Sequence, residues 1–247
     1  VVAAHNVIVR RLISQFGAYE VKTAGDSFMI AAASLDVAVA LSLALQEALM
    51  EGPIVPGFRA LEGLVGGGPS AVWRTDNIRV RIGIHWCTEV SPTFDVERLT
   101  YDYLGPDVNK TARIEGMASG GQILLEDAVY HELKATLDDT SVDDTDARRA
   151  ARAHVAQPFR EGDDVILKGI SKYVKLVSVL PPALRDREFE DGSTVVSGMA
   201  TPHPQHDMSF SISTIPHPRS RGNSMCGSPH AARKFLIGTN DGSENDV

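Results

Sequence analysis

Lys22 and Asp26 lie four residues apart in a stretch where two short apolar runs meet at Gly25-Asp26. An aspartate can ligate a hard divalent cation, and a nearby lysine can donate hydrogen bonds to a nucleotide. The same residues also suit a plain hairpin tip, in which Asp26 favours the turn and Lys22 is a solvated strand charge. This stretch alone leaves both interpretations open.

Asp102, Asn109 and Arg113 form a second group of chemically capable side chains. Asn109 and Arg113 are four residues apart, so they share one face of the helix that is expected to open at Asp107. An amide and a guanidinium near a helix N-terminus could bind an anion, although such a pair is also typical of a solvated helix face. Lys168, just before Gly169, could likewise bind an anion or be a plain turn lysine.

Hydrophobic periodicity and turn signals predict the elements that position these residues. Strands are expected in a hairpin over residues 19–30, a single strand over 78–85, a short apolar run over 122–125 and a second hairpin over 165–179. Helices are expected over residues 1–16, from Ser34 or Asp36 to about Met50, over 107–120 and over 126–136, with polar loops over 87–100 and 138–164, the latter with a short helix near 148–154. This order predicts an α+β sandwich with helices packed on a largely antiparallel sheet.

Composition divides the chain into a folded part and a tail. Residues 1–180 carry the periodic segments, interrupted over about residues 51–75 by a Gly- and Pro-rich stretch that predicts an irregular insertion. Residues 181–247 are rich in Pro, Ser and His, which predicts a disordered tail. The tail histidines lack ligand spacing and do not indicate a metal site.

Charge and cysteine content exclude several classes of protein. A formal net charge of -8 argues against a general nucleic-acid binder. Two distant cysteines, Cys87 and Cys226, support neither a disulfide framework nor a zinc site, and they fit a reducing compartment. Polar residues interrupt the apolar stretch 31–50, which therefore indicates a buried helix rather than a membrane span. The chain begins Val1-Val2 without an initiator methionine, so we expect a fragment of a longer protein.

Four segments occur in an order that resembles the class III nucleotidyl cyclases. They are Glu20-Val-Lys-Thr-Ala-Gly-Asp-Ser-Phe28, Ile82-Gly-Ile-His85, Tyr101-Asp-Tyr-Leu-Gly-Pro-Asp-Val-Asn-Lys-Thr-Ala-Arg113 and Leu167-Lys-Gly-Ile170. Their joint spacing is the specific part of the resemblance, which covers about residues 1–180. The chain is most similar to the cytosolic catalytic domain of trypanosomatid receptor-type adenylate cyclases. The resemblance implies a ferredoxin-like cyclase sandwich at the cytoplasmic face of a membrane, anchored through an upstream segment.

The resemblance also implies a role for each candidate residue. Asp26 matches one of two aspartates that hold a pair of Mg²⁺ or Mn²⁺ ions. Lys22 and Asp102 match the pair that reads the purine, and a lysine donor with a carboxylate acceptor fits adenine rather than guanine. Asn109 would orient the ribose and Arg113 would stabilise transition-state charge.

Lys168 would bind the terminal phosphates of ATP, and the products would be cyclic AMP and pyrophosphate. In this family the site forms between two chains, so Lys22 and Asp26 would serve opposite sites of a head-to-tail homodimer.

The resemblance is incomplete at the N-terminus. The family's first strand carries a Phe-x-Asp motif with the other metal aspartate, and no residue before Val1 supplies it here. The fragment as given is therefore expected to be inactive. An inactive homologue that acts as a dimerisation or regulatory domain remains the alternative. A guanylate cyclase is disfavoured by Lys22 and Asp102, and a diguanylate cyclase by the lack of a second acidic residue in the hairpin turn.

Overall fold

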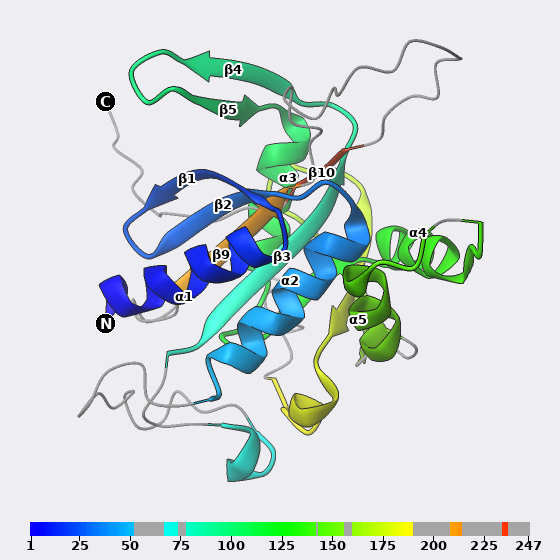
Figure 1. Cartoon of the computed structure of the whole chain (residues 1–247). Coiled ribbons are helices and arrows are strands. Elements are labelled where there is room, and N and C mark those ends of the chain that lie inside the picture. The colour runs from blue at the N-terminus through cyan, green and yellow to red at the C-terminus, as the bar shows by residue number, and fades with distance from the viewer. Residues whose placement is uncertain are drawn as a thin grey trace.

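The computed structural model describes residues 1–51, 67–73, 78–141, 143–155, 160–189, 208–213 and 234–236. An eight-stranded sheet forms its centre, with strand order β1-β2-β9-β10-β3-β6-β8-β7 (Figure 1). The strands are β1 (Tyr19–Ala24), β2 (Ser27–Ala31), β3 (Val80–Cys87), β6 (Ile123–Glu126), β7 (Arg160–Ile166), β8 (Tyr173–Val179), β9 (Met208–Ser213) and β10 (Lys234–Leu236).

Both predicted hairpins are present in this sheet. β1 and β2 pair antiparallel with Ala24 opposite Ser27, so Gly25 and Asp26 form a two-residue turn, and Gly25 has the positive φ of 61° that such turns require. β7 and β8 also pair antiparallel, and Gly169 in their connection has a φ of 76°. The predicted strand and the short apolar run are confirmed as β3 and β6.

The sheet is mixed, with more antiparallel than parallel pairings among its described strands. β3 runs parallel to β6, because the helix between them returns the chain to the same end of the sheet. β9 runs parallel to both β2 and β3. The pairs β1–β2, β6–β8 and β7–β8 are antiparallel, and so are the central pairings of β10 with β3 and with β9. The predicted α+β sandwich on a largely antiparallel sheet is therefore confirmed, with parallel pairs at its centre.

Helices cover both faces of the sheet. The helices are α1 (Val2–Gln15), α2 (Leu35–Ala48), α3 (Pro106–Gly116), α4 (Asp127–Asp138) and α5 (Asp146–Val155). Buried side chains of α1, α2, α4 and α5 pack with Ile82 and Ile84 of β3 in the main core. Side chains of β3 alternate between faces, so Gly83 lies on the opposite face, against α3. Figure 1 shows α1 and α2 lying across one face of the sheet.

A separate two-stranded hairpin replaces most of the polar loop predicted over residues 87–100. It consists of β4 (Ser91–Asp95) and β5 (Thr100–Leu104), and Figure 1 shows it extending away from the main sheet. Its large side chains Phe94, Val96, Leu99 and Leu104 are exposed. Because these apolar residues face outward among polar neighbours, the segment lacks the buried, alternating pattern that identifies a strand in a sequence.

Parts of the predicted disordered tail are ordered. Residues 182–184 form a short 3-10 helix whose Leu184 packs with Val72 and Trp73, and the buried guanidinium of Arg187 donates hydrogen bonds to Val72 O and Gly121 O, each at 2.9 Å. The tail prediction is therefore wrong for residues 181–189 and for β9 and β10, because single anchoring side chains do not change the average composition. Its other residues, and most of the predicted insertion over 51–75, lie outside the described residues.

Candidate functional site

Lys22 and Asp102, which are 80 residues apart in sequence, meet in the structure. Lys22 Nζ donates to both carboxylate oxygens of Asp102, at 3.1 Å to Oδ1 and 3.0 Å to Oδ2. The side chains are 41% and 36% exposed, so the pair is open to a ligand from solvent. A cationic donor and an anionic acceptor side by side can read a donor–acceptor edge such as that of a purine.

A small apolar cluster behind the pair holds the two side chains in place. Val21 and Met29 of the β1–β2 hairpin pack with Cys87 of β3 and with Tyr103, which follows Asp102 in β5. Val108 of α3 packs against the same cluster. The backbone N–H of Tyr103 also donates to Asp102 Oδ1 at 2.8 Å, which fixes the carboxylate.

Asp26 lies at the tip of the β1–β2 turn, and its charge acts on His5 of α1. Burial lowers the pKa of His5 in α1, while a hydrogen bond to Asn6 and the negative charge of Asp26 oppose that shift. The charge of Asp26 thus acts on His5 of α1, whereas Lys22 contacts Asp102 of β5. Within the described part of the chain, no group of three His, Cys, Asp or Glu side chains could hold a metal ion. Asp26 alone does not make a complete metal site.

Close contact with β3 fixes helix α3, which carries Asn109 and Arg113. A Cβ atom added to Gly83 would lie 2.4 Å from the backbone nitrogen of Glu115, so only glycine permits this approach. The fully buried Glu115 carboxylate also forms an ion pair with Arg81 of β3. These contacts hold the helix on the sheet and leave Asn109 exposed.

A partly buried charge network connects the start of α3 to β3 and β6. Asp107 Oδ2 accepts hydrogen bonds from the backbone N–H groups of Thr88 and Glu89, at 2.5 Å and 2.6 Å. His85 Nδ1 lies 2.8 Å from Glu126 Oε1, and His85 Nε2 lies 3.6 Å from Asp107 Oδ1.

Lys110 completes this network, with Nζ 2.7 Å from Glu126 Oε1. Burial lowers the pKa of His85, but its hydrogen bonds to Asp107 and Glu126 outweigh burial, so the pKa is raised overall. Burial raises the pKa values of Asp107 and Glu126, yet both are lowered overall, chiefly by their hydrogen bonds to His85. The network therefore favours a protonated imidazole between two carboxylates.

Lys168 lies in the turn between β7 and β8, on the side of the sheet that carries α3. Its neighbour Leu167 is buried in a cluster with Ile114, which follows Arg113 in α3. The fold thus brings the segments of Lys168 and Arg113 together, as it does for Lys22 and Asp102.

Sequence reasoning missed the supporting residues of this site. Glu20, Asp107 and Glu126 carry no spacing signal that separates them from ordinary surface carboxylates. His85 had a signal, because it shares the polar face of the strictly alternating segment 78–85 with Arg79 and Arg81.

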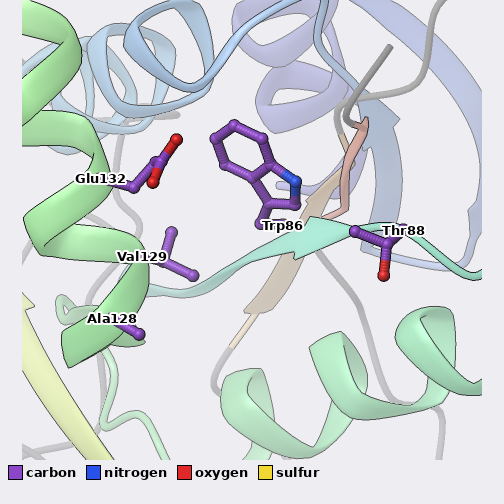
Figure 2. A pocket seen from close by; sticks show the side chains of 5 residues that line it. All are labelled: Trp86, Thr88, Ala128, Val129 and Glu132. Carbon is purple, nitrogen blue, oxygen red and sulfur yellow. The ribbon is translucent and has the colours of Figure 1, made fainter. Parts of the chain in front are cut away.

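A separate open hollow of about 320 Å³ lies between β3 and α4. Figure 2 shows its lining side chains, Trp86 and Thr88 from β3 and its end and Ala128, Val129 and Glu132 from α4. None of the predicted site residues lines it, so this hollow is distinct from the region around Lys22 and Asp102.

Comparison with known proteins identifies the class of this fold and site. Residues 1–155 match the model of the adenylate and guanylate cyclase catalytic domain, and the chain belongs to this family. The predicted resemblance to class III cyclases is confirmed.

Its relatives include trypanosomatid receptor-type enzymes. The chain is 34% identical over 227 residues to "Receptor-type adenylate cyclase GRESAG 4.1" of Trypanosoma brucei brucei, covering 78% of this chain and 17% of that protein. It is 37% identical over 134 residues to an adenylate cyclase of Lachancea kluyveri, covering 54% of this chain and 7% of that protein. The chain thus spans less than a fifth of these relatives.

A solved structure supports the fold assignment. Adenylate cyclases from Trypanosoma brucei, described in their monomeric state, superpose with a TM-score of 0.57 at 27% identity, covering 76% of this chain and 81% of that chain. Among the helices that the structure describes, none has the length and apolar character needed to cross a membrane.

Proposed function

We propose that this chain is the catalytic domain of an adenylate cyclase that converts ATP to 3′,5′-cyclic AMP and pyrophosphate. The observation that carries this proposal is the ion pair between Lys22 and Asp102. A lysine donates to a ring nitrogen of adenine, and a carboxylate accepts from the exocyclic amine, whereas guanine presents the inverse pattern. The pair therefore favours ATP over GTP.

The residues of α3 and the β7–β8 turn act on the rest of the nucleotide. Asn109 orients the ribose, and the guanidinium of Arg113 stabilises the negative charge that develops on the phosphoryl group in the transition state. Lys168 binds the terminal phosphates, which favours departure of pyrophosphate.

For the two Mg²⁺ or Mn²⁺ ions expected in this family, we assign Asp26 as one carboxylate ligand. Bound cations would neutralise the triphosphate and activate the 3′-hydroxyl. The described residues of one chain do not complete such a site. In this proposal a second carboxylate ligand must join Asp26 to complete the metal site, and activity is expected only when it is present.

The active form in this proposal is a head-to-tail homodimer. In this dimer Lys22, which contacts Asp102, and Asp26, at the hairpin turn, serve two different sites. The β4–β5 hairpin also projects an apolar surface made of Phe94, Val96, Leu99 and Leu104, whose side chains are between 46% and 74% exposed. Burying these residues against a second copy would offset the cost of association.

The receptor-type relatives support a placement at the cytoplasmic face of a membrane, within a longer anchored protein. The alternative function is an inactive homologue that acts by dimerisation alone. The exposed β4–β5 surface is compatible with it, but the Lys22–Asp102 pair would then have no purine to read.

Turnover of nucleotides separates the two functions. The chain, extended upstream by the residues of its parent protein, is incubated with ATP or GTP and Mn²⁺, and cyclic products are separated by chromatography. Cyclic AMP from ATP, with little cyclic GMP from GTP, is expected. A folded dimer that makes no cyclic product would overturn the proposal and favour the inactive partner.

A further inference from the structure

The direction of Lys22 depends on an irregularity in β1. Glu20 pairs with Ile30 and Lys22 pairs with Met29, so Val21 is one extra residue that has no partner on β2. Such a β-bulge shifts the alternation of side chains along the strand. In a regular strand Lys22 would lie on the same face as Glu20, toward α1, and could not reach Asp102.

The contacts on either side of the bulge confirm this change of face. Val21 packs with Tyr103, and Lys22 pairs with Asp102, so two consecutive side chains point to the same side. Glu20 and Thr23 both point to the other side, where Thr23 Oγ1 donates to Glu20 Oε1 at 2.6 Å. Residues three apart in a regular strand lie on opposite faces, so this hydrogen bond can form only when the bulge is present.

Helix α1 holds Glu20 in this arrangement. Arg10 donates two hydrogen bonds to the Glu20 carboxylate, from Nε to Oε2 at 2.8 Å and from a terminal nitrogen to Oε1 at 2.7 Å. The Arg10 guanidinium also lies over the Phe28 ring, 5.4 Å from its centroid, and Phe28 pairs with Thr23 across the hairpin. A bidentate arginine–carboxylate pair fixes geometry as well as charge.

We propose that Glu20, held by Arg10 and Thr23, is a positioning residue that sets the purine preference by keeping the bulge in register and Lys22 directed at Asp102. This inference rests on the proposed function, since the preference matters only if the pair reads a purine. Glu20 itself faces away from the pair and does not touch the nucleotide edge. Its effect is carried entirely by the backbone of β1.

The primary test measures Lys22 directly and needs no turnover. The folded chain is treated with a limiting amount of an acetylating reagent, and acetylation of Lys22 relative to the exposed Lys134 is measured by mass spectrometry. A lysine that is held in an ion pair reacts more slowly than a free one. Asp102→Asn provides the reference for a released Lys22, with an expected rise of about twofold to fivefold.

The double variant Glu20→Gln with Thr23→Val removes the contacts that bracket the bulge, and it is expected to raise Lys22 acetylation nearly as much as Asp102→Asn. Thr23→Ser keeps the hydroxyl and should retain the wild-type rate. Asp144→Asn breaks an exposed arginine–carboxylate pair with Arg152, far from the hairpin, and should also change nothing. If the double variant does not fold, Glu20→Gln alone carries the same comparison.

If Lys22 is acetylated at the wild-type rate in the folded Glu20 variant, the proposal is overturned. An unchanged rate of Lys22 acetylation in Asp102→Asn would also overturn it, because the Lys22–Asp102 pair would then be absent in solution. In the active, upstream-extended protein the double variant should also lower the ratio of ATP to GTP turnover, with a larger change in KM than in kcat. Absence of any cyclic product would count against the proposed function, while the acetylation result would still decide the role of Glu20.

Discussion

Gly83 of β3 and Glu115 of α3 approach so closely that a methyl group on Gly83 would lie 2.4 Å from the Glu115 backbone nitrogen. The helix that carries Asn109 and Arg113 is therefore fixed at its distance from the sheet by the absence of one side chain.

Gly83→Ala is expected to destabilise the fold and displace α3. Backbone cannot move aside as a flexible side chain can, so the overpacking should cost about 1–3 kcal/mol and lower Tm by several degrees. Thermal unfolding followed by circular dichroism measures this loss. Gly116→Ala is the matched control, because a Cβ there meets nothing within 4 Å and alanine suits a helix better than glycine. Equal Tm values for both variants would contradict the packing argument.

Exchanging the purine-reading pair should change the nucleotide preference. Lys22→Glu together with Asp102→Cys replaces the adenine donor–acceptor pattern with one that suits guanine, and we expect the ratio of kcat/KM for ATP over GTP to fall by at least about tenfold. The ratio is measured in the upstream-extended protein with both nucleotides present. An unchanged preference for ATP would remove Lys22 and Asp102 from purine reading.

Two inactive variants should complement each other if the site is shared between chains. In the upstream-extended protein, Asp26→Ala and Arg113→Ala are each expected to abolish activity, yet random exchange of subunits leaves about a quarter of all sites with both residues intact. Cyclic AMP formation after mixing measures the recovery. Mixing Arg113→Ala with Asn109→Ala is the control, since those residues belong to the same side of the site and no site is restored. Absence of recovery with demonstrated exchange would contradict the shared site.

The contribution of His85 to stability should depend on pH. Because its folded pKa is raised, its stabilising effect is fully present below its unfolded pKa of about 6.5 and is lost as the pH rises through the folded value. The lowered pKa values of Asp107 and Glu126 act in the opposite sense, with stabilisation lost as the pH falls through their folded values.

The difference in Tm between wild type and His85→Gln is therefore expected to be larger at pH 6 than at pH 8. Taking this difference removes the opposite effect of His5, whose pKa is lowered and which is common to both proteins. His131→Gln, at an exposed position on α4, serves as the control. A difference that is constant or grows with pH would show that the network does not hold a protonated imidazole.

The sequence predicted the local elements that carry the candidate residues. The β1–β2 hairpin followed from Gly25-Asp26, and the motif order predicted Lys22 and Asp102 as partners in one task. Their contact could not follow from spacing, because it depends on the unpaired Val21 in β1. A bulge arises from the balance of contacts on both faces of a strand, and no periodicity records it.

Among the strands that were missed, β4 and β9 were missed for opposite reasons. β4 keeps its apolar residues outside, so its sequence does not resemble a buried strand. β9 alternates as Met-Ser-Phe-Ser-Ile-Ser over residues 208–213, which is strand periodicity, but the polar composition around it favoured disorder. Average composition over a long window concealed a short regular segment.

The position of β9 has a consequence for how the chain folds during synthesis. β9 lies between β2 and β3, with Phe28 opposite Phe210. These pairings have very high sequence separation, and contacts of this kind form slowly because a long loop must close first. The ribosome releases β1, β2 and β3 long before residues 208–213, so the central pairing of this sheet waits until those residues have emerged.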